Sequence, residues 1–270
     1  MLLVLSAVFI LKACLLGVVQ GITEFLPVSS SAHVVLLSSL LGGIGPHSKA
    51  MLIFLQGVSV LAVVRLYRPA LWQVIVNYNT TGRSFIIGVA LGTLPFVAIG
   101  GISHGFVVRN LFSPMVVSIN LIIGGFVLIV ANYFCRIDKY NNISSLDEIK
   151  PLTSLMVGLI QVLAVLPGVS RSGSTIIGGM LCGMSRPLAV KYSFILAIPL
   201  LTAVSIFQMS SVINLLTMDE WVILLISSLV TFFISCAVVR ILVDFLGHGS
   251  NSLLLIGGYR VFLGIAILIL

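Results

Sequence analysis

The chain has 270 residues, of which 59% are hydrophobic and only 8% are charged. Soluble domains carry about 25% charged residues, so this composition excludes a water-soluble globular protein and indicates an integral membrane protein. The formal net charge is +7, but the basic residues are scattered along the chain, which argues against a nucleic-acid-binding surface. We therefore expect membrane lipids around the protein and no nucleic acid as a partner.

Apolar stretches of two lengths follow one another along the sequence. A helix that crosses about 30 Å of hydrocarbon needs about 20 residues. Six stretches are predicted to span the membrane, the first and last being only marginally long enough: 51–66, 85–103, 115–135, 188–212, 221–243 and 253–270. Four further stretches are predicted to be helical without forming separate spans: 2–26, 33–42, 153–166 and 174–183.

Two polar turns that contain proline join these four stretches in pairs. They read LPVSSSAH at 26–33 and LPGVSRSGST at 166–175. Irregular backbone at membrane depth is tolerated only where it is buried in protein or lines a wet cavity. Each pair is therefore predicted to be a re-entrant helix-turn-helix hairpin that enters and leaves on one side. The predicted fold class is an all-α polytopic membrane protein with about six spans and two re-entrant hairpins.

The two hairpins also resemble each other in sequence. Shifting the chain by 141 residues superimposes these identical pairs: Gly17 and Gly158, Gln20 and Gln161, Val28 and Val169, Ser29 and Ser170, Ser31 and Ser172, Leu40 and Leu181, and Gly42 and Gly183. Three spans separate the hairpins, and an odd number inverts the second copy, which predicts an inverted-topology repeat. We expect one membrane domain, 1–270, with a first repeat over 1–135, a cytoplasmic connector over 136–150 and a second repeat over 151–270. Chance similarity between apolar helices is the alternative.

The basic residues in the loops predict an orientation. Only Lys49 and Arg109 fall on the side of the amino terminus. Nine fall on the opposite side: Arg65, Arg68, Arg83, Arg136, Lys139, Lys150, Arg186, Lys191 and Arg240. Loops rich in Lys and Arg stay in the cytoplasm, so both termini and the 26–33 turn are predicted to face outward.

Two charged residues are predicted at membrane depth, Glu24 and Arg171. The other acidic residues are placed in loops or at a span end: Asp138, Asp147, Glu148, Asp219, Glu220 and Asp244. An ionisable group at the bilayer centre costs about 2.5–3.5 kcal/mol on insertion scales, so a functional role is the default interpretation. Gln20, four residues before Glu24, lies on the same helical face. An ion pair made only for packing is the alternative, disfavoured because apolar replacements are usually at least as stable.

Hydroxyl groups surround these two charges. They belong to Ser29, Ser30 and Ser31 in the first turn and to Ser170, Ser172, Ser174 and Thr175 in the second. Both turns lead into helix amino-termini, expected at residues 33 and 174, where free N–H groups and the helix dipole favour phosphate. Arginine adds planar, bidentate recognition of phosphate. Each serine alone is explained by helix capping, but the set predicts an anion site, and His33 lies one turn after Ser30 and within reach of the same ligand.

The segments GVVQGITEFLPVSSSAH at 17–33 and PGVSRSGST at 167–175 resemble the two signature motifs of the undecaprenyl-diphosphate phosphatases of the bacitracin-resistance type. The resemblance extends to YSFILAIP at 192–199 and YR at 259–260. It implies a bacterial cytoplasmic-membrane enzyme that removes the terminal phosphate of undecaprenyl diphosphate and recycles the lipid carrier for peptidoglycan synthesis. It also implies a divalent metal requirement, with Mg²⁺ or Ca²⁺ held by Gln20, Glu24 and diphosphate oxygens.

The resemblance assigns roles to the residues of the two turns. Ser30 is expected to attack the terminal phosphorus, Glu24 to take its proton or hold the metal, and Arg171 to stabilise the charge. Water would then release the phosphoseryl group with help from His33. Direct attack by a water molecule activated by the metal is the mechanistic alternative.

A transporter is the competing functional class. Inverted repeats with broken helices at the midplane are common in secondary transporters, and a lipid-phosphate flippase would use the same anion site without a nucleophile. A purely structural membrane scaffold would leave Glu24 and Arg171 unexplained. The sequence does not fix an oligomeric state, and a homo-oligomer is compatible with it.

Overall fold

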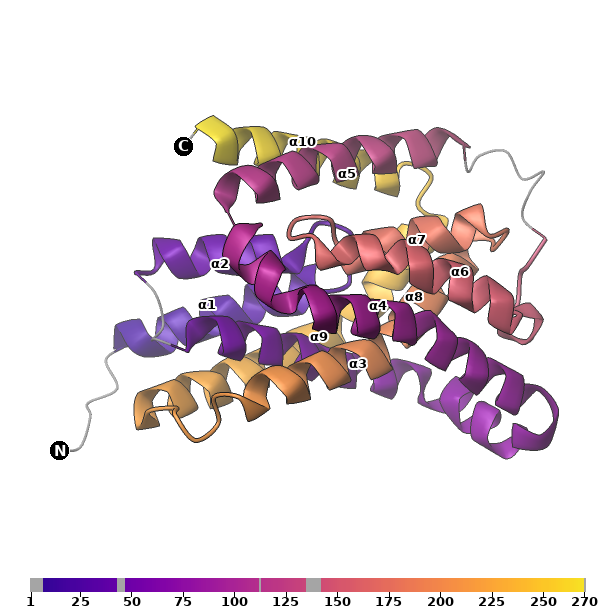
Figure 1. Ribbon diagram of the computed structural model, residues 1–270, viewed down its shortest axis with the longest axis horizontal. Coiled ribbons are helices and arrows are strands. Elements are labelled where there is room, and N and C mark those ends of the chain that lie inside the picture. The colour runs from indigo at the N-terminus through magenta and orange to yellow at the C-terminus, as the bar shows by residue number, and fades with distance from the viewer. Residues whose placement is uncertain (1–6, 43–46, 112, 135–141, 270) are drawn as a thin grey trace.

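The computed structural model describes residues 7–42, 47–111, 113–134 and 142–269. Within these ranges the chain is helical and forms no β-strand, apart from an isolated bridge between Ile143 and Met184. Six helices are long and apolar enough to cross a membrane: α3 (Ser48–Val76), α4 (Arg83–Asn110), α5 (Pro114–Phe134), α8 (Arg186–Ser210), α9 (Met218–His248) and α10 (Ser252–Ile269). The protein is therefore a multi-pass membrane protein, and the six predicted spans are confirmed (Figure 1).

The remaining helices form two pairs on either side of the polar turns. The first pair is α1 (Ala7–Thr23) and α2 (Ser30–Leu40). The second is α6 (Pro151–Gln161), continued by the 3-10 turn η4 (Val162–Val165), and α7 (Arg171–Leu181). Two further short turns are the π-helical η1 (Tyr78–Gly82) and the 3-10 turn η3 (Leu146–Glu148). The helix-turn-helix pairs have the predicted form, and their re-entrant placement in a membrane stays a prediction.

The short helices begin one turn earlier than predicted. The expected starts at residues 33 and 174 are wrong, because α2 begins at Ser30 and α7 at Arg171. In α7 the preceding Ser170 caps the helix, with its Oγ accepting a hydrogen bond from the Gly173 N–H at 3.3 Å. A serine in this position accepts a hydrogen bond from a free N–H group at the start of a helix. The polar residues that the sequence analysis placed in the turn therefore already belong to the helix.

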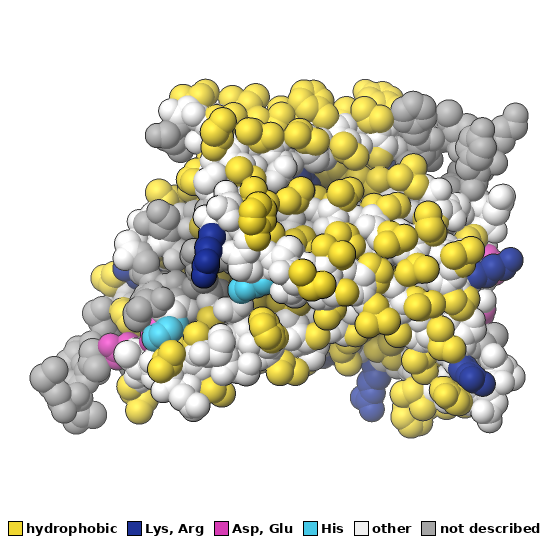
Figure 2. Space-filling view, viewed as in Figure 1, with side chains coloured by type: hydrophobic (Ala, Val, Ile, Leu, Met, Phe, Trp, Pro, Cys, Tyr) yellow, Lys and Arg dark blue, Asp and Glu magenta, His cyan; other side chains and the backbone are white. Residues whose placement is uncertain are grey.

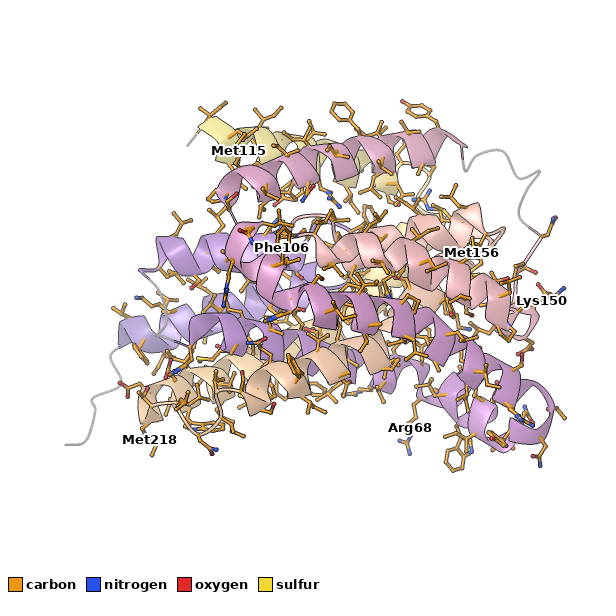
Figure 3. The ribbon with its side chains drawn as sticks, in the orientation of Figure 1. Arg68, Phe106, Met115, Lys150, Met156 and Met218 are labelled. Atoms are coloured by element: carbon orange, nitrogen blue, oxygen red, sulfur yellow. The ribbon has the colours of Figure 1, made fainter. Side chains whose placement is uncertain are left out.

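Helix α3 is also longer than predicted. Its expected end at residue 66 is wrong, because the helix continues to Val76 past Arg65, Arg68 and Pro69. Basic side chains at the end of a span extend toward the interface while their aliphatic stems stay in apolar surroundings. Figure 3 shows Arg68 projecting from this end of α3. The charged residues at this end therefore continue the helix beyond the apolar stretch.

The helices of the two halves are interleaved. Helix α1 packs along α9, and α6 packs along α4, while α3 lies against α8 and α5 against α10 (Figure 1). Under the 141-residue shift α1 corresponds to α6 and α9 to α4, so the first two pairings are reciprocal. Such reciprocity is what the predicted repeat requires. The boundaries 1–135, 136–150 and 151–270 stay predictions, and residues 135–141 lie outside the described part of the chain.

Small residues and hydroxyls bring α1 and α9 together. The hydroxyl groups of α9 donate to carbonyl oxygens of α1 in three successive turns: Ser227 to Ala13 at 3.1 Å, Thr231 to Gly17 at 3.3 Å and Ser235 to Gly21 at 3.3 Å. A Cβ on Gly17 would lie 2.7 Å from the Ser227 carbonyl oxygen. Close contact through glycine and interhelical hydrogen bonds from Ser and Thr are typical of membrane helices.

The surface agrees with a membrane location. Apolar side chains cover most of the face seen in Figure 2. In Figure 3 the basic Arg68 and Lys150 lie toward one end of the helices, and Met115 and Met218 lie toward the other.

The connector at the basic end includes Glu148, whose carboxylate accepts hydrogen bonds from the Ser144 N–H at 2.8 Å and the Ser145 N–H at 3.4 Å. These bonds favour the charged form and lower the pKa of Glu148.

One acidic residue is more buried than predicted. Glu220, expected in a loop, lies in the first turn of α9 and is 2% exposed. Its carboxylate accepts hydrogen bonds from the His47 N–H at 3.0 Å and from the Thr217 N–H at 3.0 Å, and it lies 3.1 Å from Nδ1 of the His47 ring. Glu220 is thus a buried carboxylate that joins α3 to α9.

Candidate active site

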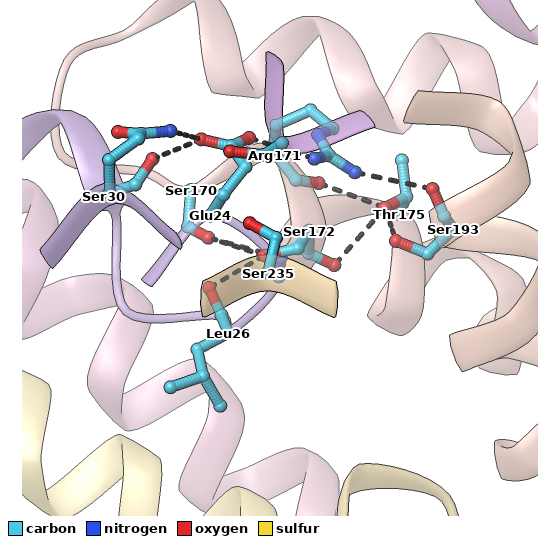
Figure 4. A network of polar contacts seen from close by, with 12 residues as sticks. Glu24, Leu26, Ser30, Ser170, Arg171, Ser172, Thr175, Ser193 and Ser235 are labelled. Carbon is cyan, nitrogen blue, oxygen red and sulfur yellow. Dashed lines mark hydrogen bonds and ion pairs between the residues drawn. The ribbon is translucent and has the colours of Figure 1, made fainter. Parts of the chain in front are cut away.

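The two polar turns meet in the interior of the protein. Ser172 Oγ, in the second hairpin, donates to the Leu26 carbonyl oxygen of the first turn at 2.9 Å. An ion pair 3.0 Å long joins Arg171 to Glu24. Figure 4 shows this network, in which side chains from α1, α2, α7 and α8 converge. The fold therefore brings together the two charges that the sequence placed at membrane depth.

The backbone of the two turns has the same unusual feature. Ser29 has a φ of 68° and Ser170 a φ of 77°, the positive φ values found for non-glycine residues in the described chain. In both turns this serine lies near the serine two residues later, with an Oγ to Oγ distance of 3.4 Å between Ser29 and Ser31 and 3.2 Å between Ser170 and Ser172. Strained backbone of this kind is often found at functional sites, and here it directs the amino-termini of α2 and α7 toward one site.

The carboxylate of Glu24 is the centre of the site. Its Oε2 accepts hydrogen bonds from Gln20 Nε2 at 2.8 Å and from Ser30 Oγ at 2.7 Å, while Oε1 accepts one from Arg171 at 3.0 Å. The residue is 6% exposed. An ion pair made only for packing would explain the contact between Glu24 and Arg171. It would not explain the hydrogen bond from the Ser30 hydroxyl to the same carboxylate. The geometry of a hydroxyl nucleophile next to a carboxylate base is present.

Arg171 is held on its other side by α8. One guanidinium NH₂ group donates to the Ser193 carbonyl oxygen at 3.3 Å, and the guanidinium lies 5.9 Å from the centre of the Phe25 ring. Thr175 Oγ1 lies 2.5 Å from Ser193 Oγ. The Nε of Arg171 has no acceptor among the described residues, so the side chain retains a donor for a ligand. Sequence reasoning did not single out Ser193, although it lies inside the segment YSFILAIP.

The other hydroxyls of the second turn bond to the protein itself. Ser174 Oγ donates to the Ser170 carbonyl oxygen at 3.1 Å, and Thr175 Oγ1 donates to the Arg171 carbonyl oxygen at 3.0 Å. These bonds stabilise the start of α7. The predicted substrate-binding set, Ser29, Ser31, Ser170, Ser172, Ser174 and Thr175, is therefore gathered around the two turns, and its contact with substrate stays a prediction.

The imidazole of His33 has a hydrogen-bond partner on each ring nitrogen. Its Nδ1 lies 2.9 Å from the Ser29 carbonyl oxygen, and its Nε2 lies 2.6 Å from the hydroxyl of Tyr259 in α10. The two rings are stacked, with centroids 5.6 Å apart and an angle of 20° between their planes. The structure thus joins His33 to a residue of the last helix, and its predicted role in catalysis stays a prediction.

Arg260 is a site residue that the sequence analysis missed. It is 1% exposed, and no acidic residue of the described chain pairs with it. It donates to five carbonyl oxygens, those of Pro27, Gly168, Val169, Asn120 and Leu121, at 2.9, 2.9, 3.1, 3.2 and 3.4 Å. The side chain therefore ties both turns to α5. The signal was present, because an arginine inside the predicted span 253–270 meets the same rule that identified Glu24.

The donor atoms near Glu24 fit a hard divalent cation that shares ligands with a phosphate. No group of three His, Cys, Asp or Glu residues in the described chain could hold a metal by itself. Gln20 Oε1 is buried without a hydrogen-bond partner. An amide oxygen, a carboxylate and a hydroxyl are ligands that Mg²⁺ and Ca²⁺ prefer, and Mg²⁺ usually completes its shell with water and substrate phosphates.

Comparison with known proteins gives a consistent result. The family model described as bacitracin resistance protein BacA matches residues 13–266. An undecaprenyl-diphosphatase of Acidovorax ebreus is 36% identical over 267 residues, which are 98% of this chain and 96% of that protein. One of Methylobacillus flagellatus is 35% identical over 98% of both chains. A protein named undecaprenyl-diphosphatase 2 from Paramagnetospirillum magneticum is 38% identical over 88% of this chain and 91% of its own length.

Proposed function

Because the chain belongs to the bacitracin resistance protein BacA family, we propose that it hydrolyses the terminal phosphate of undecaprenyl diphosphate. The products are undecaprenyl phosphate and inorganic phosphate, so the reaction recycles the lipid carrier for cell-wall synthesis and confers bacitracin resistance. The observation that carries the proposal is the hydrogen bond of 2.7 Å from Ser30 Oγ to Glu24 Oε2, next to the ion pair with Arg171.

In the first step Ser30 Oγ attacks the terminal phosphorus. Glu24 takes the hydroxyl proton through the existing hydrogen bond, and the bond from phosphorus to the bridging oxygen breaks. Arg171 and the first N–H groups of α2 and α7 stabilise the charge on the phosphoryl oxygens. Because Ser30 and Arg171 are the first residues of these helices, both side chains lie where the helix dipoles favour an anion.

In the second step water releases the phosphoseryl group. Ser30 regains the proton held by Glu24, and the proton of the water leaves through a second base, for which His33 is the candidate. Direct attack by water on the substrate is the alternative, and the Ser30 variant described below distinguishes the two.

Gln20 and Glu24 would hold the divalent cation, Mg²⁺ or Ca²⁺, together with diphosphate oxygens of the substrate. Bound there, the ion would neutralise charge on the diphosphate oxygens. Gln20 Oε1 is the atom that supports this assignment, because it is buried and otherwise unpartnered.

We propose that the protein lies in the bacterial cytoplasmic membrane with both termini and the active site facing outward. The excess of basic residues in the opposite loops supports this orientation. A cysteine introduced at Asn142, in a background without native cysteines, should react from the cytoplasmic side only. Labelling from outside intact cells would mean that the protein has the opposite orientation. Membrane lipids surround the protein in this arrangement. The arrangement is also compatible with a homo-oligomer.

A lipid-phosphate flippase is the alternative function. It would need the anion site but not a serine hydroxyl bonded to a buried carboxylate, so the geometry around Glu24 favours hydrolysis.

Phosphate release by the purified protein in detergent tests the proposal, because no gradient exists there to drive transport. The substrate is undecaprenyl diphosphate with Mg²⁺ or Ca²⁺ supplied separately. We expect release by the wild type and a loss of about 10³-fold or more in Ser30→Ala. Ser103→Ala is the matched control, since its exposed hydroxyl bonds only within α4, to the Ile99 carbonyl oxygen, and it should retain full activity. A wild type without phosphatase activity would contradict the function, and an active Ser30→Ala would favour direct attack by water.

A further inference from the structure

The last helix places a tyrosine hydroxyl on the ring of His33. Tyr259 and Arg260 are neighbours in α10, and they point to different parts of the site. Arg260 is buried among the carbonyl groups of both turns, whereas Tyr259 is 44% exposed. Because Arg260 is fixed by five hydrogen bonds, α10 holds the Tyr259 ring against His33 rather than leaving it free.

The hydrogen bonds of His33 define its tautomer. The Ser29 carbonyl oxygen can only accept, so the Nδ1 that lies 2.9 Å from it must carry a proton. In the neutral ring Nε2 is then the acceptor, and the Tyr259 hydroxyl at 2.6 Å must be the donor. Both ring nitrogens therefore have a hydrogen-bond partner. Only Nε2 can gain or lose a proton while the bond to the Ser29 carbonyl oxygen is kept, and Nε2 is the nitrogen that Tyr259 contacts.

We propose that Tyr259 is a further catalytic residue, whose hydroxyl donates to Nε2 of His33 and relays the proton of the attacking water to that nitrogen. The proposal rests on the proposed phosphatase activity and names how the second base of that reaction is reached. Ser30 and His33 lie three residues apart in α2 and so share a helical face. The His33 ring that Tyr259 contacts therefore belongs to a residue one helical turn after the serine that would carry the phosphoryl group.

The proton balance of the second step follows from this arrangement. The water oxygen bonds to phosphorus, the bond from phosphorus to Ser30 Oγ breaks, and Oγ regains the proton that Glu24 took in the first step. The proton of the water passes to the Tyr259 oxygen as the tyrosine proton moves to Nε2 of His33. Tyr259 is neutral before and after, and His33 ends as the imidazolium, which returns its proton to solvent by the same route.

The first test is nitrogen NMR of protein labelled with ¹⁵N-histidine in detergent, with the His33 signals assigned by their loss in His33→Ala. We expect a protonated Nδ1 and an unprotonated Nε2 in the wild type, and a shift of the Nε2 signal alone in Tyr259→Phe. This substitution removes the hydroxyl and keeps the stacked ring. Tyr133→Phe removes an exposed hydroxyl from α5 and should leave the His33 signals unchanged. A protonated Nε2 in the wild type at neutral pH, with Nδ1 bare, would overturn the proposal.

The second test is kinetic and uses the same variants. Tyr259→Phe should lower kcat by about tenfold or more while KM stays within about twofold. In a His33→Ala background the same change should lower kcat no further, because the group that Tyr259 serves is gone. An unchanged kcat in Tyr259→Phe, or an equal decrease in the His33→Ala background, would contradict the relay role. If the wild type released no phosphate, the proposed function would fail, and the NMR signals would still decide whether Tyr259 donates to Nε2 of His33.

Discussion

The turn at 26–33 and the turn at 166–175 place Ser29 and Ser170 in the same backbone conformation, with φ values of 68° and 77°. The residue that follows differs, being Ser30 in the first turn and Arg171 in the second. The carboxylate of Glu24 has Val165 as its counterpart under the 141-residue shift. Turns of like form thus present the proposed nucleophile and its proposed base on one side and a cation on the other. The comparison teaches that two turns of like backbone can each present a helix amino-terminus to the site while their side chains take different chemical roles.

Removing the negative charge from the first turn should have the largest effect. Glu24→Gln keeps the size of the side chain but removes the base and the charge, and we expect phosphate release to fall by about 10³-fold. Phosphate release and thermal unfolding should be measured on one purified sample. Glu148→Gln, which changes an exposed carboxylate of the connector, is the control. An active but destabilised Glu24→Gln protein would instead mean that the carboxylate serves packing.

Loosening the connection between the two turns should have the next largest effect. Arg260→Met fills similar space but removes the donor to the turn carbonyl groups of Pro27, Gly168 and Val169, and buried unsatisfied groups cost about 1–3 kcal/mol each without adding fully. We expect the free energy of unfolding to fall by about 3 kcal/mol. Denaturation of the purified protein measures it, with Arg240→Met on the exposed face of α9 as control. Equal stability of the two variants would show that Arg260 does not hold the turns.

A smaller effect is expected from changing the shape of the cation in the second turn. Arg171→Lys keeps the charge but loses the planar fork, so turnover should fall by about tenfold, which is about 1.4 kcal/mol of transition-state stabilisation. The kinetic measurement is phosphate release at saturating substrate. Arg68→Lys at the exposed end of α3 should have no effect, and unchanged turnover in a folded Arg171→Lys protein would make Arg171 structural.

The smallest effect is expected from replacing the two serines with positive φ, Ser29 and Ser170, by glycine. Glycine adopts a positive φ without strain, so Ser29→Gly should raise the free energy of unfolding by about 1 kcal/mol. Ser170→Gly should raise it less, because the Oγ that accepts from the Gly173 N–H is lost. Parallel thermal unfolding of both variants checks the order. A larger gain in Ser170→Gly would mean that its cap contributes nothing.

Much of the fold could be predicted from the sequence because the membrane makes hydrophobic length and buried charge unusually informative. The six spans follow from length alone, and Glu24 and Arg171 stand out because an isolated charge at membrane depth needs a reason. Their meeting across the two turns is confirmed. The sequence failed to predict where the short helices begin, as at Arg171, where the cap by Ser170 starts the helix among residues typical of a turn.

The remaining features depend on contacts between distant parts of the chain. His33 and Tyr259 are 226 residues apart, and no local pattern reports that a ring nitrogen and a hydroxyl will meet. Glu220 looked like a loop residue because nothing near it in the sequence shows that His47 will cover it. Arg260 was within reach of the sequence, because its burial follows from the span in which it lies.

The pairing of α1 with α9 has a consequence for biosynthesis. Glu24 and Arg171 are 147 residues apart, and at about 5–20 residues per second the ribosome takes roughly 7 to 30 s to make that length. During this interval the first hairpin has neither its arginine nor α9, which supplies three hydroxyl groups to its carbonyls. The amino-terminal hairpin is therefore inserted early and assembled late, so a ribosome that stops before Arg171 leaves a carboxylate at membrane depth with no cation to meet it.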